Sequence, residues 1–171
     1  WGALVGIYTD LEMVLVFTAT PIGLGGVCHA IVKGPSVAEL EAIGTLVRSR
    51  VWRPGKATKA LARDPVDVLL AHRDRLSVTF AASVEESKDI AARACSAGLR
   101  ICHVDGNTRK RGELLAGLGR EWDGVTNFNV LTEGWNCPPI SLCVLAAPTQ
   151  SLIAYLQRVG RVLRAAPGKA D

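Results

Sequence analysis

The chain has 171 residues, of which 49% are hydrophobic and 21% are charged, and its formal net charge is +4. This length and composition suit one compact α/β domain with a real core and a little extra chain. No apolar run approaches the ~20 residues that cross a bilayer and no signal peptide is visible, so we expect a cytoplasmic protein without a membrane partner. The positive net charge favours a polyanionic partner only modestly.

The cysteines and histidines form no pattern that is typical of a disulfide framework or a metal site. No C-x-x-C pair occurs, and each cysteine lies in or beside an apolar stretch, so we interpret all of them as buried free thiols. The five cysteines are Cys28, Cys95, Cys102, Cys137 and Cys143. The three histidines are too scattered for a ligand set, and we predict no structural metal.

The N-terminal part contains an uninterrupted apolar run, Met13 to Phe17, which predicts a strand. The run leads into Thr18-Ala19-Thr20-Pro21, which places two hydroxyls where a strand ends and a site could begin. A glycine-rich loop follows, and residues 27–32 are a second candidate strand.

Residues 35–63 are predicted to connect two parts of the chain. Ser36 and Glu39 form a capping box that predicts a helix to about Val47. From Arg48 to Arg63 there are six cations and no acid. That stretch indicates either a solvated linker or an arm that contacts nucleic acid.

Strands and helices alternate from residue 64 onward. The expected strands are residues 76–81, 99–104, 124–127 and 140–147, and the expected helices begin at residues 65, 84, 109 and 152. This rhythm predicts a parallel sheet with right-handed crossovers and helices on both faces. Ligands bind such sheets at the carboxyl ends of the strands.

The helix expected at residue 109 carries Arg109, Lys110 and Arg111 in its first turn. Three cations there oppose the helix dipole, at a cost of roughly 0.3–1 kcal/mol each. Either a nucleic-acid phosphate or solvent would compensate, and the sequence leaves both open.

In the last expected helix, Arg158, Arg161 and Arg164 recur every third residue, which predicts three guanidiniums on or near one face. The opposite side is predicted to pack through Leu152, Leu156, Val159 and Leu163. Guanidinium groups suit phosphate oxygens, although ordinary surface arginines would give the same pattern.

Four segments resemble motifs of superfamily 2 helicases of the DEAD/DEAH-box type. The segment Gln157 to Arg164, QRVGRVLR, resembles motif VI, and Val130 to Pro138 resembles motif V. The segments FTATP (17–21) and FAAS (80–83) resemble motifs III and IV. The resemblance implies that residues 64–171 are a second RecA-like domain, preceded by a linker (35–63) and a remnant of a first RecA-like domain (1–34).

The resemblance implies the C-terminal half of an ATP-dependent nucleic-acid helicase or translocase. It assigns Arg161 and Arg164 as arginine fingers, with Gln157 orienting the γ-phosphate or water. It assigns nucleotide contacts to Gly134, Asn136 and Arg158. It assigns contacts to the DNA or RNA backbone to Ser83, Gly106, Asn107, Thr126 and Asn127, and coupling between the two sites to Thr18 and Thr20.

Departures from the family pattern limit what we expect of this chain alone. No G-x-x-x-x-G-K-[S/T] loop and no DEAD or DEAH tetrad occurs, so ATP and Mg²⁺ are expected to be held mostly by a missing N-terminal RecA-like domain. Gly23 stands where relatives often have arginine, and Asn136 where many have aspartate. The alternative is a catalytically inactive nucleic-acid-binding or interaction module derived from a helicase.

Overall fold

A computed structural model describes residues 30, 32, 34–51, 63–132, 134–147, 149 and 151–169. The chain divides into two units, Trp1–Ser36 and Val37–Asp171, and nearly all described residues belong to the second. The expected strand at residues 13–17 and the coupling residues Thr18 and Thr20 lie outside the described residues, as do all but two residues of the expected strand at 27–32.

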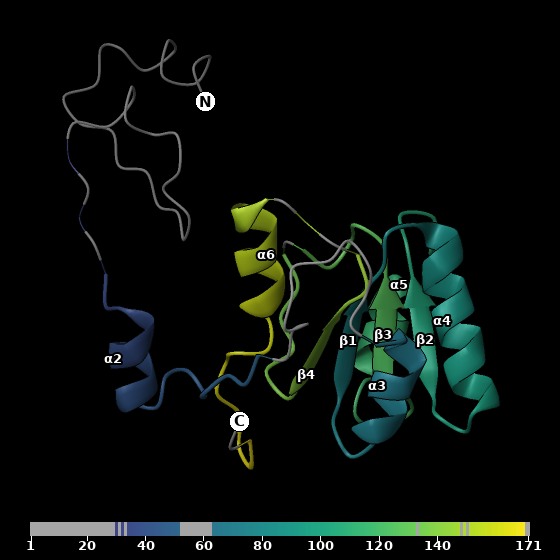
Figure 1. Cartoon of the computed structure of the whole chain (residues 1–171), viewed down its shortest axis with the longest axis horizontal. Coiled ribbons are helices and arrows are strands. Elements are labelled where there is room, and N and C mark those ends of the chain that lie inside the picture. Colours follow the sequence, from purple (N-terminus) through teal and green to yellow (C-terminus); the bar gives the residue numbers. More distant parts are fainter. Residues whose placement is uncertain are drawn as a thin grey trace, which may run out of the picture. The chain divides into compact units, whose positions relative to one another are not determined.

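The second unit is built on a sheet of four parallel strands in the order β2-β3-β1-β4 (Figure 1). They are β1 (Ser77–Phe80), β2 (Ile101–Val104), β3 (Gly124–Asn127) and β4 (Leu142–Leu145). β1 pairs with β3 and β4, and β3 also pairs with β2. The predicted parallel α/β fold is confirmed. β3 has the expected bounds, and the other three strands are a few residues shorter than expected.

The two central strands are buried at every position, as expected for parallel strands covered on both faces. β1 and β3 approach so closely at their start that Gly124 has no room for a side chain. A Cβ there would lie 1.9 Å from Ser77 Oγ. Glycine at this position therefore lets the two strands pair.

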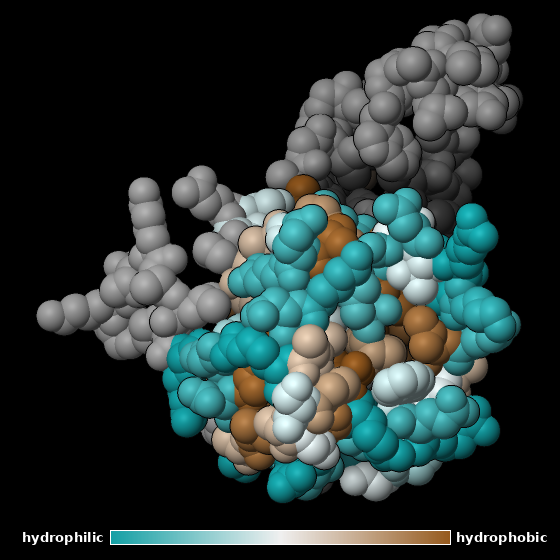
Figure 2. All heavy atoms as spheres, turned by 90° about the vertical axis from the view of Figure 1, so that its right-hand side faces the viewer, coloured by the Kyte–Doolittle hydropathy of each residue, from teal (hydrophilic) through white to brown (hydrophobic). Residues whose placement is uncertain are grey.

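One face of the sheet is covered by α3 (Pro65–Ala71) and α4 (Val84–Ser96). Their apolar residues, among them Leu69 and Ile90, pack with Ile101 and Val144 in one buried cluster. The outward side of α4 is polar, with exposed Lys88 and Arg93. Figure 2, in which the side of Figure 1 that carries α4 faces the viewer, shows hydrophilic residues with groups of hydrophobic ones between them.

The other face is covered by α5 (Arg111–Ala116) and by the loop between β3 and β4. Phe80, Val104 and Val125 point to this side and pack with Leu131 and Ile140 from the loop. The loop therefore takes part in the core, although most of it has no regular secondary structure.

Two helices differ from the expectation. α2 (Val37–Ala42) ends before Gly44, which has a φ of +74°, so it is shorter than the predicted helix to Val47. α6 (Leu152–Val159) ends before the last two motif VI arginines, so Arg161 and Arg164 do not lie on the helix. The predicted packing of its apolar side is also wrong in part, because Leu152 is 59% and Leu156 44% exposed.

The four cysteines that the structure describes are free thiols. Burial raises the pKa of Cys102 to about 11 and that of Cys143 to about 12. Cys95 is exposed, so the expectation that it is buried is wrong, whereas Cys28 lies outside the described residues. In the described part of the chain, no helix is both long and apolar enough to cross a membrane.

Candidate functional site at the carboxyl edge of the sheet

All four strands point the same way, so the loops that follow them meet at one edge of the sheet. Apart from Thr18 and Thr20, every predicted site residue lies at this edge, in the loop between β3 and β4, or in the segment that begins with α6. Ser83 follows β1, Gly106 and Asn107 follow β2, and Asn127 ends β3. The sheet therefore brings together motifs that are far apart in the sequence.

Arg161 joins motif VI to motif V. Its Nη1 donates a hydrogen bond to the carbonyl of Trp135, and its Nη2 donates to the carbonyl of Thr132. Gly134 lies between these two residues in the chain and has a φ of +68°, a conformation that favours glycine. One planar guanidinium thus binds the backbone on both sides of the glycine.

Arg164 makes the second connection between the two motifs, because its Nη1 donates to Asn136 Oδ1. The backbone next to it is held as well. Leu163 O accepts a hydrogen bond of 2.8 Å from Val47 N, and Leu46 and Arg164 form an antiparallel bridge. A segment predicted to be a linker therefore pairs with the end of motif VI.

Arg158 lies over the ring of Phe80, with its guanidinium carbon 5.4 Å from the ring centroid. Its Nε and Nη1 are buried and have no hydrogen-bond partner among the described residues. Buried donors without acceptors are costly, and the ring offsets only part of that cost. These two nitrogens therefore suit an oxygen of an anionic ligand. Gln157, the preceding residue of α6, is half-buried.

Ser83 caps α4, as its capping box predicts. Its Oγ accepts a hydrogen bond of 3.1 Å from Glu86 N, and Glu86 Oε2 accepts one of 2.6 Å from Ala82 N. Ser83 remains partly exposed at the edge.

The loop after β2 is shaped by Asp105. Its Oδ1 accepts hydrogen bonds from Asn107 N at 2.9 Å and from Thr108 Oγ1 at 2.8 Å. The bond from Thr108 is the main cause that lowers the pKa of Asp105. Gly106 and Asn107 stand exposed at the tip of this loop.

Three exposed cations continue from this loop into α5. Only Arg111 belongs to the helix, because Arg109 and Lys110 precede it, so the predicted crowding of three cations within its first turn is wrong. Lys110 Nζ lies 3.2 Å from Glu113 Oε2, in a pair that is exposed on both sides and worth little to stability. The cations remain available to a polyanion.

Thr126 and Asn127 have no exposed surface. Thr126 Oγ1 donates to the carbonyl of Ser87 at 2.8 Å, and Asn127 Nδ2 donates to the carbonyl of Thr79 at 2.9 Å. Asn127 Oδ1 also accepts from Leu131 N at 3.4 Å. Their burial does not fit the prediction that they contact a nucleic-acid backbone, and both side chains instead hold the end of β3 and the start of motif V.

A buried polar chain between α4 and β2 could not be predicted from the sequence. Ser87 Oγ lies 2.7 Å from His103 Nδ1, and His103 Nε2 lies 3.3 Å from Asp105 Oδ2. The order resembles a hydrolytic triad, but Ser87 is completely buried and cannot meet a substrate. Ser87 lies 16 residues before His103, and the spacing of the three residues matches no known sequence motif.

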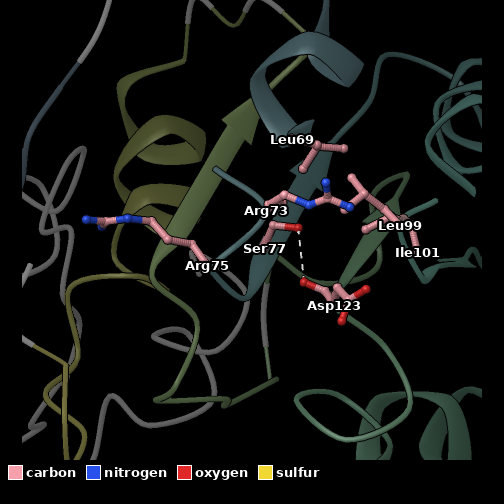
Figure 3. A pocket seen from close by; sticks show the side chains of 7 residues that line it. All are labelled: Leu69, Arg73, Arg75, Ser77, Leu99, Ile101 and Asp123. Carbon is pink, nitrogen blue, oxygen red and sulfur yellow. Dashed lines mark hydrogen bonds between the residues drawn. The ribbon is translucent and has the colours of Figure 1, made fainter. Parts of the chain in front are cut away.

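A shallow hollow lies at the opposite, amino edge of the sheet (Figure 3). Its wall includes Ser77, Arg73 and Asp123, and Ser77 Oγ donates a 3.5 Å hydrogen bond to Asp123 O. Arg100 binds both carboxylate oxygens of Asp123, which lowers the pKa of that carboxyl. Since none of the motif residues lines this hollow, it is not the candidate site.

Comparisons with known proteins agree with these motifs. A family model described as "Helicase conserved C-terminal domain" matches residues 61–166. The "51.5 kDa protein" of a Lactococcus phage (isolate 7-9) is 30% identical over 110 residues, which cover 62% of this chain and 24% of that protein. This chain thus spans about a quarter of the length of that relative.

Two solved structures resemble this chain in fold. A variant of S. cerevisiae Dbp5 bound to RNA and ADP BeF3 matches with a TM-score of 0.50 and 21% identity, over 56% of this chain and 27% of that one. The C-terminal domain of the DEAD-box protein Dbp5 matches with a TM-score of 0.50 and 22% identity, over 61% of this chain and 64% of that one. The α/β fold is therefore RecA-like, as the motifs implied.

Proposed function

This chain belongs to the family of helicase conserved C-terminal domains, and from that premise we propose that it is the C-terminal half of an ATP-dependent nucleic-acid helicase or translocase acting in the cytoplasm. The observation that carries the proposal is the junction of motifs V and VI, where Arg161 and Arg164 reach Thr132, Trp135 and Asn136. A domain without this task would gain little from directing two motif VI arginines into the motif V loop.

Arg158 is the residue that best fits a phosphate, because its buried Nε and Nη1 have no acceptor in the described part of the chain. Bound ATP would supply the phosphoryl group whose transfer drives motion. Arg161 and Arg164 would act on that group as arginine fingers. Gln157 would orient the γ-phosphate or a water beside them.

The described residues do not fit a Mg²⁺ site. Among them, no group of three His, Cys, Asp or Glu side chains is placed to hold a metal ion. We therefore propose that the ligands for Mg²⁺ and most contacts to ATP come from an N-terminal RecA-like domain outside this chain. Thr18 and Thr20 would couple that domain to this one.

The nucleic-acid surface that we propose consists of Ser83, Gly106 and Asn107 together with the exposed Arg109 and Arg111. Contacts to the phosphate backbone carry no sequence information, so binding should tolerate any sequence and weaken with salt. The structure of Dbp5 bound to RNA and ADP BeF3 supports a partner of this kind. Single-stranded or duplex DNA or RNA would all present the same phosphates.

The second candidate function is a catalytically inactive nucleic-acid-binding module. Asn136 favours it, because a neutral amide holds Arg164 less firmly than the aspartate of many relatives would. The same surface around Gly106 and Asn107 would then bind nucleic acid without any nucleotide.

The test is ATP hydrolysis and nucleic-acid binding by this chain over a range of salt concentrations. We expect no hydrolysis, and salt-sensitive binding whose salt slope falls by about 1 for each cation removed in Arg109→Gln and Arg111→Gln. Lys88→Gln, on the outward side of α4, is the matched control and should leave binding unchanged.

Binding that ignores salt, or that falls equally in Lys88→Gln, would reject this surface. Hydrolysis by the chain alone that disappears in Arg161→Ala would show that the chain builds a complete phosphate site. In that case, the proposal that most ATP contacts come from an N-terminal RecA-like domain outside this chain is wrong.

A further inference from the structure

The ammonium group of Lys169 is held by three backbone carbonyls. Nζ donates to Pro138 O at 3.0 Å, to Ile140 O at 2.5 Å and to Arg164 O at 2.9 Å. A lysine ammonium has three N–H donors, so these contacts use all of them. The group therefore has no donor left for a phosphate, although it stands at the end of motif VI.

The local sequence explains how the side chain reaches this position. In Ala166-Pro167-Gly168-Lys169, the amide of Lys169 donates to the carbonyl of Ala166 at 3.1 Å, and Gly168 has a φ of +78°. Proline second and glycine third is the pattern of a type II turn, in which the third residue needs a positive φ. The turn folds the chain back, so that the lysine points toward the loop before β4.

The three carbonyls belong to both sides of the motif V and VI junction. Pro138 and Ile140 lie two and four residues after Asn136, and the third carbonyl is that of Arg164, whose guanidinium reaches the Asn136 side chain. Lys169 therefore closes a ring of contacts that begins and ends at the Asn136–Arg164 pair. Without the ammonium, three carbonyl oxygens would face one another with no donor between them.

We propose that Lys169 is a positioning residue that fixes Arg164 against Asn136. The proposal rests on the proposed function only in one respect, which is that the proposed function gives Arg164 a role as an arginine finger. The ammonium is half-buried, and burial lowers the pKa of Lys169. Three carbonyl dipoles aimed at one charge offset that cost, which is the arrangement of a built cation site rather than of a solvated surface lysine.

The experiment measures amide hydrogen exchange across the full chain in Lys169→Ala and Lys169→Met. We expect faster exchange in both variants at the amides of Cys137 and Ile140 and of residues 160–164, while the amides of β1 and β3 keep their protection. Lys169→Met retains most of the apolar stem, so an equal effect in both variants assigns the role to the ammonium. Lys88→Met, which removes an exposed ammonium from α4, is the control and should change neither region.

Chemical rescue separates positioning from general packing. Propylammonium added to Lys169→Ala should restore the lost protection, because it supplies three N–H donors and a short apolar stem. Tetramethylammonium carries the same charge without any N–H and should restore nothing.

Equal rescue by both cations, unchanged exchange at residues 160–164, or protection lost throughout the sheet would each overturn the proposal. None of these readouts requires ATP or nucleic acid. Failure of the proposed function therefore shows separately, as an absence of salt-sensitive nucleic-acid binding by the unmodified chain.

Discussion

The guanidinium carbon of Arg158 lies 5.4 Å from the centroid of the Phe80 ring, which connects α6 to the last residue of β1. We expect this pair to contribute about 0.5–2 kcal/mol of coupling energy. The measurement is a double-mutant cycle with Phe80→Leu and Arg158→Met, followed by urea unfolding. The cycle cancels the destabilisation that Phe80→Leu causes on its own by shrinking a core side chain. A coupling energy near zero would show that the Arg158 guanidinium does not stay on the ring in solution.

Asn136→Asp should strengthen the contact with Arg164, because a carboxylate is a better acceptor for a guanidinium than an amide oxygen is. The pair is exposed, so the expected gain in unfolding free energy is only about 0.2–1 kcal/mol and should shrink at high salt. In an Arg164→Met background the same substitution should gain nothing. A gain that persists there would mean that the new charge acts on another group.

The amide of Val47 should exchange with solvent much more slowly than that of Arg48, since Val47 N donates to Leu163 O at 2.8 Å. Val47→Pro removes this donor and part of a buried side chain, which we expect to cost about 1–3 kcal/mol. Ser49→Pro, on the exposed chain two residues later, is the control. Equal loss in both variants would refute a specific role for the pairing with motif VI.

Acid should weaken the fold through Asp123. The Arg100 guanidinium holds the pKa of this carboxyl below its ordinary value, so the folded state favours the ionised form. The stabilisation by ionised Asp123 is complete above the pKa that this carboxyl has in the unfolded chain. It is lost as the pH falls through the lower pKa of the folded state, which places the loss below about pH 4. Unfolding measured from pH 6 to pH 2 should therefore show a smaller acid loss in Arg100→Met than in the unmodified chain.

Ser83 can be tested for its two roles with two substitutions. Ser83→Ala removes the cap of α4 and should cost about 1 kcal/mol in unfolding free energy. Ser83→Asp keeps a capping oxygen and should preserve stability, but its negative charge should weaken nucleic-acid binding. Binding that is unaffected by Ser83→Asp would limit Ser83 to capping the helix.

Local signals were enough to predict much of the fold. The capping box at Ser83 and the glycine after α4 mark both ends of that helix, because each acts within one turn of the chain. The alternation of strands and helices from residue 64 then limits the topology to a parallel sheet. The motif VI arginines were also identified, although not the carbonyls of Thr132 and Trp135 that Arg161 contacts.

What the sequence could not predict depends on contacts between distant segments. A three-residue arginine period looks helical throughout, yet α6 ends at Val159 and Arg161 and Arg164 continue toward the motif V loop. Thr126 and Asn127 were assigned to the nucleic-acid backbone by the family resemblance alone. Only the strand order shows that β3 lies between β2 and β1, where both side chains are covered.

The strand order also governs the timing of folding during synthesis. β1 is made first among the described strands, but both of its neighbours, β3 and β4, lie far downstream in the chain. Until Leu145 has left the ribosome, β1 lacks at least one of its two pairing strands, and the apolar side chains of Val78 and Phe80 lack part of their final core. Such long-range pairing slows folding and exposes strands that aggregate. The nascent chain should therefore depend on chaperones most strongly between the completion of β1 and that of β4.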